Sequence, residues 1–482
     1  MAGTIQAGAR WALLTGIVAR LGGPAFLVIL ARILTPEDFG LMAVAMVVIA
    51  FATLFQDLGL KQALVQRKEA GEGLRLAVFW GSAGIGVAWF AVLWLVAPWL
   101  ADAYRNPDVV PIVRALGAVF LVGPLGTVPE ALLLRELDFR RLFGVELVPS
   151  LVPGAVAVVL GLLGYGVWSL VWGQIAGAVL RTAVLWAMVS WRPTGVPPRG
   201  GWRHLTRFGG WVSLEALLAW SITYLDQAFA GRFLSLAGVG YYRMGVALAL
   251  YPARGISQVL ARVLLPAFSR HQDDPARLRE ALERCVHIVA LVTVPAGAAA
   301  VAFADPMVPL VLGERWRPAV PVLQVFAMAG VLSALVNVAP PLYKAVGRVD
   351  IMPKFFIVRA AVSIPVYWFA AQRGLMPLVT AKLLLTCLFA PVNLMIAVWV
   401  FGASPRRVLA PIAMAGAAAA LAAWLAHGLV RAGTGFGALP PWGEMAVALP
   451  AFGAAYLLLL GVVSARSRQE LVWLARTLSG RR

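Results

Sequence analysis

Charged residues are scarce in this sequence. Asp, Glu, Lys and Arg make up 13% of its 482 residues, whereas 61% are hydrophobic. The mean hydropathy is +0.83. Because a soluble globular domain carries about a quarter charged residues, the composition excludes that class and indicates an integral membrane protein.

Residues suited to catalysis or metal binding are also few. The two cysteines, Cys285 and Cys387, are predicted to be free buried thiols. The four histidines are scattered without the spacing of metal ligands, and no P-loop occurs. We therefore expect no catalytic residues, no metal, no cofactor and no enzymatic activity.

Long apolar segments dominate what is present. A membrane-spanning helix needs about 20 mainly apolar residues, and fourteen segments meet that need. We expect the first to be a transmembrane helix and not a cleavable signal peptide. The predicted fold is all-α, with about fourteen transmembrane helices at residues 10–31, 39–60, 76–98, 110–133, 142–163, 166–190, 209–230, 238–264, 286–312, 319–342, 352–371, 375–401, 408–429 and 443–464.

Positive charge alternates between successive loops. Of the 41 Lys and Arg residues, 25 lie in one set of loops and the C-terminal tail, and 8 lie in the other set. Because basic loops stay in the cytoplasm, both termini are predicted to be cytoplasmic, which requires an even number of spans. The net charge of +19 is then explained by topology and attraction to membrane lipids, and we expect no nucleic-acid partner.

One helix–turn–helix corner occurs twice, in Ala31–Met46 and Gly231–Val246. The two segments align without gaps, with the matches Arg32/Arg232, Leu34/Leu234, Thr35/Ser235 and Gly40/Gly240. We interpret the corner as a structural hinge of two parallel repeats related by an axis along the membrane normal. The predicted domains are a six-helix lobe at 1–200, a second six-helix lobe at 201–402, and two further helices with a basic tail at 403–482.

Several basic residues lie inside the predicted helices, where a charge at the bilayer centre costs about 2.5–3.5 kcal/mol. Those near helix ends can extend to the interface. The others are predicted to line a cavity and bind an anion such as a diphosphate, and either Arg181 or Lys382 could instead pair with a buried carboxylate. These candidate binding residues are Arg20, Arg181, Arg254, Arg359 and Lys382.

Acidic residues inside the predicted helices are candidates for ion coupling or for pairs with these arginines. Glu215 and Asp226 are eleven residues apart, and therefore share one face of a helix. Asp57, Glu130 and Glu146 lie near the predicted cytoplasmic ends, where a structural ion pair or cap is favoured.

Four segments resemble the polysaccharide transporter family, the Wzx-type flippases of the MOP superfamily. They are Leu30–Glu69 with its LARILTPEDFG corner, LLLRELDFRRL at Leu132–Leu142, Gly164–Gly177 and Gly238–Gly245. The resemblance implies two six-helix lobes plus two helices, and alternating access that moves an undecaprenyl-diphosphate-linked oligosaccharide across the inner membrane. By location, it places Arg20 and Arg254 near the diphosphate. It also implies partnership with a polysaccharide polymerase and chain-length machinery, and we expect a monomer.

Three alternatives compete with this interpretation. A multidrug or small-solute antiporter of the same superfamily would need deep acidic residues in its first half, where the deepest charges here are arginines. A membrane-embedded glycan polymerase or glycosyltransferase would need larger extramembrane loops or paired catalytic acids. A purely structural membrane protein would not explain charges placed deep in the bilayer.

Overall fold

The structure, a computed structural model, describes residues 22–56, 60–66, 71–136, 139–195, 203–250, 274–348, 350–433, 440–464 and 467–470. All the regular secondary structure in these residues is helical. The chain forms two compact units, Met1–Gly240 and Tyr241–Arg482. The two units are defined by packing within the structure, whereas the three predicted domains are defined by the repeat in the sequence. The predicted domain boundaries therefore stay a prediction.

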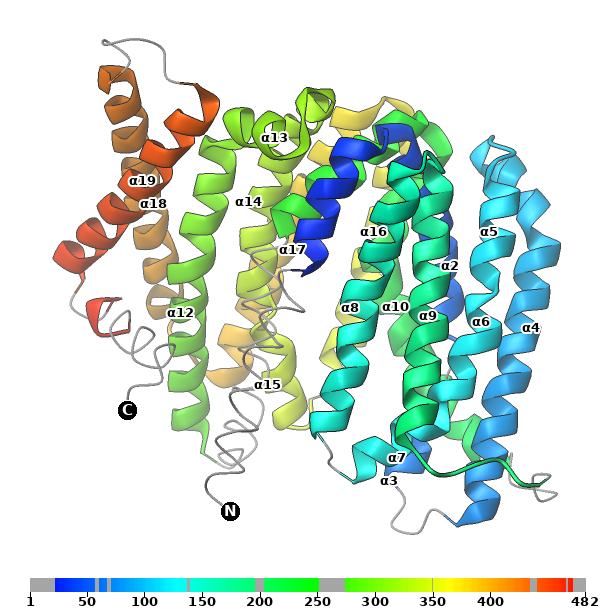
Figure 1. The fold of residues 1–482 in the computed structure, drawn as a ribbon. Coiled ribbons are helices and arrows are strands. Elements are labelled where there is room, and N and C mark those ends of the chain that lie inside the picture. The colour runs from blue at the N-terminus through cyan, green and yellow to red at the C-terminus, as the bar shows by residue number, and fades with distance from the viewer. Residues whose placement is uncertain are drawn as a thin grey trace. The chain divides into compact units, whose positions relative to one another are not determined.

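The first unit is a bundle in which α8 packs along α9, α4 along α5, and α10 along α2 (Figure 1). A helix at Gly22–Ile33 precedes the labelled ones. The labelled helices are α2 (Pro36–Thr53), α3 (Leu60–Gln66), α4 (Glu72–Tyr104), α5 (Val109–Gly117), α6 (Val119–Val122), η1 (Gly123–Gly126), α7 (Thr127–Arg135), α8 (Phe139–Leu162), α9 (Val167–Met188) and α10 (Arg203–Phe233).

The second unit is built around α12, which packs against both α14 and α18. A helix at Leu236–Leu250 crosses the boundary between the units. The labelled helices are α12 (Pro275–Ala302), α13 (Ala304–Leu312), η2 (Glu314–Ala319), α14 (Val320–Val336), α15 (Ala339–Ala345), α16 (Ile351–Gln372), α17 (Leu375–Phe401), α18 (Pro405–Gly433) and α19 (Pro441–Val463).

Ten helical segments of the described chain are long and apolar enough to cross a membrane, and three apolar helices are shorter. The chain is therefore a multi-pass membrane protein. Each of the fourteen predicted segments overlaps a helix in the structure. The number of fourteen spans stays a prediction, because ten segments of the described chain meet the criteria of length and hydropathy.

Several helices begin earlier than hydropathy predicts. Helix α12 begins at Pro275, within the predicted polar loop, because Asp274 accepts hydrogen bonds from the backbone N–H groups of Ala276 and Arg277. It ends at Ala302, ten residues before the predicted end, and α13 follows as a separate helix. A prediction based only on runs of apolar residues does not include the polar turns with which a helix extends beyond the bilayer.

The predicted span at 110–133 is a chain of short helices, α5, α6, η1 and α7. The break falls at Gly123–Gly126, whose sequence is GPLG. Pro124 has no N–H to donate, so a regular helix cannot pass through it unchanged. This break sets α7 at the end of the segment, where it carries Glu130.

The two corners have the same backbone conformation. Leu34 N–H donates to Leu30 C=O at 2.8 Å, and Leu234 N–H donates to Ala230 C=O at 2.9 Å. The hydroxyl of Thr35 accepts from Asp38 N–H at 3.3 Å, and the hydroxyl of Ser235 accepts from Gly238 N–H at 3.1 Å. The structure thus confirms that the corner is repeated.

The two corners also contact each other through Gly40 and Gly240. A Cβ added to Gly40 would lie 1.9 Å from the carbonyl oxygen of Leu236, and one added to Gly240 would lie 2.0 Å from that of Pro36. Each glycine therefore packs on the backbone of the other corner. Both positions require glycine, because any Cβ would overlap a backbone oxygen.

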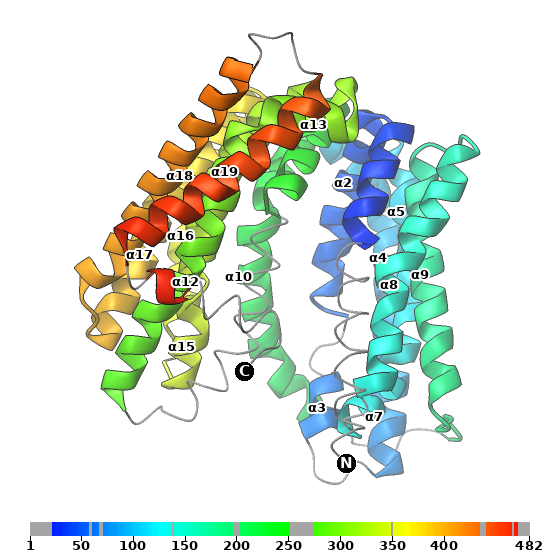
Figure 2. The ribbon, with the colours of Figure 1, turned by 60° about the vertical axis from the view of Figure 1, so that its left-hand side comes forward.

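In the second unit, α18 and α19 pack against each other and against α12 (Figure 2). The hydroxyl of Tyr456 donates to Leu291 C=O at 2.9 Å. Beyond α19, Ser467 Oγ lies 3.0 Å from His287 Nε2, and Glu470 forms an ion pair with Arg284 at 2.9 Å. The C-terminal helices and the residues that follow them thus contact α12 through packing, hydrogen bonds and an ion pair.

Candidate functional site: a charged pocket in the first unit

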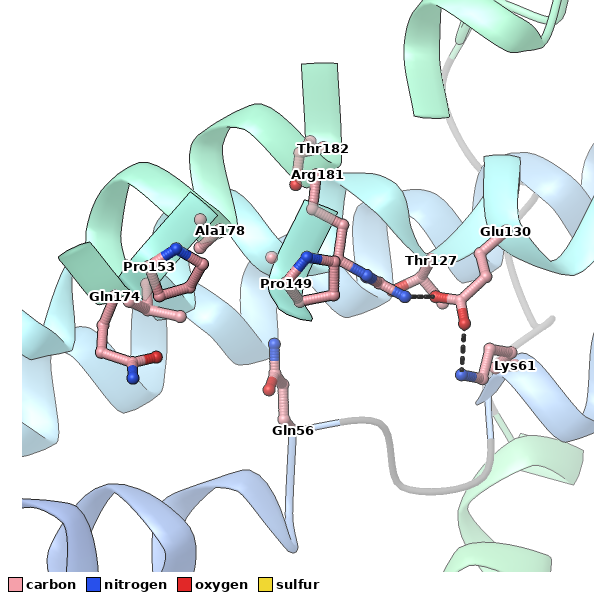
Figure 3. Close-up of a pocket in the computed structure, with 13 residues that line it drawn as sticks. Gln56, Lys61, Thr127, Glu130, Pro149, Pro153, Gln174, Ala178, Arg181 and Thr182 are labelled. Carbon is pink, nitrogen blue, oxygen red and sulfur yellow. Dashed lines mark hydrogen bonds and ion pairs between the residues drawn. The ribbon is translucent and has the colours of Figure 1, made fainter. Parts of the chain in front are cut away.

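The first unit contains a pocket of about 360 Å³ between α8, α9 and the broken segment that ends in α7. We call it the Glu130 pocket. Figure 3 shows charged side chains at one end of it, and Gln56 and Gln174 toward the other (Figure 3). Its polar lining residues are Gln56, Lys61, Thr127, Glu130, Gln174, Arg181 and Thr182.

Glu130 stands between two cations. Its Oε1 accepts from Lys61 Nζ at 3.1 Å, and its Oε2 accepts from Arg181 Nη2 at 2.8 Å. The Glu130 side chain is 18% exposed, and those of Lys61 and Arg181 are 31% and 30% exposed. Since these groups are largely removed from solvent, the charge-assisted hydrogen bonds are stronger than those of a surface pair.

Glycines on α9 direct Arg181 into the pocket. Gly173, Gly177 and Arg181 recur every four residues and so lie along one face of the helix. A Cβ on Gly173 would lie 2.4 Å from the carbonyl oxygen of Pro153, and one on Gly177 would lie 2.7 Å from Pro153 Cγ. Because this face packs directly on α8, the next position on it, Arg181, points between the helices.

Helices α3 and α7 bring Lys61 to Glu130. Arg135, on the last turn of α7, donates from Nη1 to the carbonyl of Leu64 on α3 at 2.9 Å. On the other side, Thr182 Oγ1 donates to the carbonyl of Val122 at 3.3 Å. These contacts tie α7 to α3 and the break before η1 to α9, so the three charges come from three separate helices.

Two of the predicted binding residues, Arg359 and Lys382, lie in the second unit. The guanidinium carbon of Arg359, on α16, is 6.0 Å from the centroid of the Phe389 ring on α17. Lys382 Nζ, on α17, is 5.6 Å from the Tyr367 ring centroid on α16. Each cation thus lies over a ring of the neighbouring helix, in the geometry of a cation–π interaction. Arg181 belongs to the first unit, so each unit carries some of the predicted binding residues.

The other predicted residues divide by position. Asp226, on α10, is buried, with 2% of its surface exposed. Glu215 also lies on α10, but its side chain is outside the described part of the chain. Arg20, Asp57 and Arg254 lie outside the described residues altogether. The described residues contain no group of three or more His, Cys, Asp or Glu side chains that could hold a metal ion.

Sequence reasoning identified Arg181 as a buried cation and Glu130 as a member of a structural ion pair, but it assigned Lys61 to a loop. It also missed two neutral polar residues of the pocket, Thr127 and Gln174. Lys61 and Glu130 are 69 residues apart in the chain, and no periodicity in the sequence links them. Gly173 and Gly177, eight and four residues before Arg181, were the signal in the sequence for the face of α9 that lines the pocket.

Comparisons with known proteins agree on one family. The family described as "Polysaccharide biosynthesis protein" matches residues 29–321. The chain is 28% identical over 380 residues to the lipopolysaccharide biosynthesis protein WzxC of Escherichia coli K12, covering 76% of this chain and 75% of that one. It is 29% identical over 350 residues to the succinoglycan biosynthesis transport protein ExoT of Rhizobium meliloti, covering 72% and 70%.

Solved structures show the fold. The lipid II flippase MurJ, in an inward closed conformation, superposes with a TM-score of 0.77 at 11% identity, over 93% of this chain and 97% of that one. An inward-facing multidrug resistance MATE transporter of the MOP superfamily superposes with a TM-score of 0.63 at 16% identity, over 80% and 98%. The chain therefore has the MOP-type fold and belongs to the polysaccharide biosynthesis protein family.

Proposed function

We propose that this protein moves an undecaprenyl-diphosphate-linked oligosaccharide from the inner to the outer leaflet of the bacterial inner membrane, for the synthesis of a surface polysaccharide. The observation that carries the proposal is membership of the polysaccharide biosynthesis family in a chain with the MOP-type fold. The names of the relatives WzxC and ExoT and of MurJ support it. Basic residues within the membrane helices supply the charge that a diphosphate needs.

In this proposal the diphosphate meets Arg20 and Arg254, with Arg181, Arg359 and Lys382 as further cations. An ionised group costs several kcal/mol in hydrocarbon, so a flippase must offset the charge of the substrate along its path. Asp57, Glu215 and Asp226 are the proposed groups for coupling to an ion. The chain works as a monomer, with both termini in the cytoplasm and next to a polymerase and chain-length machinery.

Substitution in cells tests the proposal. A strain that depends on this protein should lose its surface polysaccharide with Arg20→Ala or Arg254→Ala, while the protein remains inserted and folded. The lipid-linked oligosaccharide should then accumulate in the inner leaflet, because its synthesis continues without export. Normal polysaccharide from both variants would refute the role of these arginines, and normal polysaccharide after deletion of the whole gene would refute the function.

The alternative is a small-solute or multidrug antiporter, which the MATE-like fold admits. The same deletion strain distinguishes the two functions. An antiporter predicts increased accumulation of cationic drugs with unchanged polysaccharide, whereas a flippase predicts the reverse.

A further inference from the structure

The hydrogen-bond ladder of α12 is interrupted at Pro295. In an α-helix the N–H of each residue donates to the carbonyl four residues earlier, and proline has no N–H to donate. Pro295 therefore frees the carbonyl of Leu291 from its usual partner within the helix. This carbonyl lies in a segment long and apolar enough to cross a membrane, where an unsatisfied backbone group is strongly unfavourable.

The C-terminal helix α19 supplies the missing hydrogen bond. The hydroxyl of Tyr456 donates to Leu291 C=O at 2.9 Å, although the two residues are 165 positions apart in the chain. Leu291 is 2% exposed and Tyr456 is 4% exposed, so water does not compete for either group. Because a buried tyrosine hydroxyl also needs a partner, the carbonyl and the hydroxyl satisfy each other. Helices α12, α18 and α19 pack together around this bond (Figure 2).

Two further features lie within two residues of Pro295 on α12. Thr293 Oγ1 donates to Val289 C=O at 2.8 Å, a type of side-chain bond that bends helices. Gly297 has low helix propensity and packs directly on α14, since a Cβ there would lie 2.3 Å from Val331 Cγ2. This point of α12 is therefore less rigid than a regular helix, and two neighbouring helices, α14 and α19, contact it.

The first unit contains a similar arrangement in α4. Pro98 frees the carbonyl of Trp94, and Arg114 Nε donates to that carbonyl at 3.3 Å. The guanidinium carbon of Arg114 also lies 3.9 Å from the centroid of the Trp94 ring. Helices α4 and α12 contain the third predicted segment of the first and of the second lobe. In α4 the partner comes from α5, the next helix in the chain, whereas in α12 it comes from α19, which lies outside the predicted repeat.

We propose that Pro295 is a hinge of α12 and that the hydrogen bond from Tyr456 is a latch on this hinge, closed in this conformation and opened when α12 bends. Tyr456 is then a positioning residue, which acts through the shape of α12 and not by contact with a substrate. The C-terminal helices thereby control a moving element of the second unit. The inference goes beyond the proposed function, because it concerns a movement of the protein that does not depend on the substrate carried.

A double-mutant cycle tests the link between the two side chains. Tyr456→Phe removes only the hydroxyl, and Pro295→Ala restores an N–H that can donate to Leu291 C=O. Tyr456→Phe should lower the thermal unfolding midpoint of the purified full-length protein, because the carbonyl is left buried without a donor. In the Pro295→Ala background the decrease should be at least about twofold smaller. Equal decreases in both backgrounds would overturn the latch.

Tyr343→Phe is the matched control. Tyr343 is also buried, and its hydroxyl donates to the carbonyl of Asn393 on α17 at 3.3 Å and lies 3.4 Å from the Oδ1 atom of that residue. Ala397, four residues later, has an N–H for the same carbonyl. Tyr343→Phe should therefore lower the midpoint equally with and without Pro295→Ala. If Pro295→Ala reduced this effect as well, the interaction would be one of general stability, and the latch would be refuted.

Hydrogen exchange followed by mass spectrometry distinguishes a hinge from a bond that only adds stability. Tyr456→Phe should raise the exchange of backbone amides at residues 289–299 by about tenfold, and leave α14 and α17 unchanged. Tyr343→Phe should leave residues 289–299 unchanged. An equal increase over the whole second unit after Tyr456→Phe would contradict a local hinge.

Polysaccharide production in cells supplies the functional readout. Pro295→Ala makes α12 a continuous helix, and its unfolding midpoint should be unchanged or higher. A hinge predicts that this stable, inserted variant loses the surface polysaccharide, and normal production would overturn the hinge. Failure of the proposed function is separate: if deletion of the whole gene leaves the polysaccharide unchanged, that function is refuted, and the midpoints and hydrogen exchange still decide the latch.

Discussion

At the scale of single residues, Glu130 is placed where its removal has a defined consequence. It is 18% exposed and accepts from both Lys61 and Arg181, so its removal takes one charge-assisted hydrogen bond from each of two cations. Without it, each cation loses a charged acceptor in a site that is only partly open to water. The same arrangement in water would matter little, because exposed ion pairs contribute at most about 1 kcal/mol.

We therefore expect Glu130→Ala to lower the free energy of unfolding by about 1–3 kcal/mol, measured as a lower thermal unfolding midpoint of the purified protein. The comparison is Asp350→Ala, which removes an exposed carboxylate from Arg348 and Lys354 and should leave the midpoint almost unchanged. The hydrogen bond from Lys354 holds the pKa of Asp350 below its usual value, so this group is ionised at neutral pH. Equal effects of the two substitutions would contradict the difference in burial.

Sequence reasoning reached one half of this site. Arg181 lies deep in an apolar segment, which was enough to predict either an anion site or a carboxylate partner, and the structure shows the carboxylate partner. Hydropathy placed Lys61 outside the membrane span and did not reveal that α3 folds back onto α7. Contacts between residues far apart in the chain depend on helix packing, and spacing within one segment does not report it.

At the scale of helices, the repeated corner is the element that the sequence predicted in most detail. An alignment with no gaps matched Thr35 with Ser235 and Gly40 with Gly240, and the structure gives both pairs the same local role. The alignment did not show that the corners touch. That contact is made between two segments 200 residues apart in the chain. A pattern within either segment cannot predict it.

We expect Gly40→Ala and Gly240→Ala each to destabilise the protein by about 1–3 kcal/mol, since the added methyl group meets a backbone oxygen that cannot rotate away. Gly84→Ala on α4 is the control, because a Cβ there meets nothing within 4 Å. It should be neutral or stabilise by about 0.5–1 kcal/mol, the usual effect of removing a helical glycine. Thermal unfolding midpoints and the yield of inserted protein measure both effects, and a neutral Gly40→Ala would show that the corners are not in tight contact in the membrane.

A second prediction at this scale concerns the start of α12. Asp274→Ala removes the acceptor for the N–H groups of Ala276 and Arg277, and should cost about 1 kcal/mol. Asp274→Asn retains the acceptor, so its thermal unfolding midpoint should be close to that of the unsubstituted protein. If Asn fails to restore stability, the carboxylate acts through its ion pair with Arg277 and not as a cap.

At the scale of the whole molecule, topology follows from where the basic residues lie. The loops with 25 of the 41 Lys and Arg residues are predicted to stay in the cytoplasm, and the charge counts hold whether or not each helix is long enough to span alone. In α8 (Phe139–Leu162) the apolar part begins only at Leu147, so a rule of about 20 apolar residues per span is a weaker guide to topology than the charges of the loops.

Reporter fusions measure this topology. Green fluorescent protein fused after Arg482 should fluoresce, because it folds in the cytoplasm, and alkaline phosphatase fused after Arg105 should be active, because that loop is predicted to be external. The reciprocal fusions should be inactive. Alkaline phosphatase activity after Arg482 would show that the C-terminus is external. The predicted orientation would then be reversed, or the number of spans would be odd.

The contact between Gly40 and Gly240 has a consequence for the origin of the chain. Position 40 meets the backbone at 236, and position 240 meets the backbone at 36, which is the reciprocal pattern that two identical subunits make across a two-fold axis. A single repeat unit carrying one corner would already hold both halves of this contact. Two copies of such an ancestor, paired as a homodimer through this contact and then joined by gene fusion, would give the arrangement seen here, in which a Cβ on either glycine meets the backbone of the other corner.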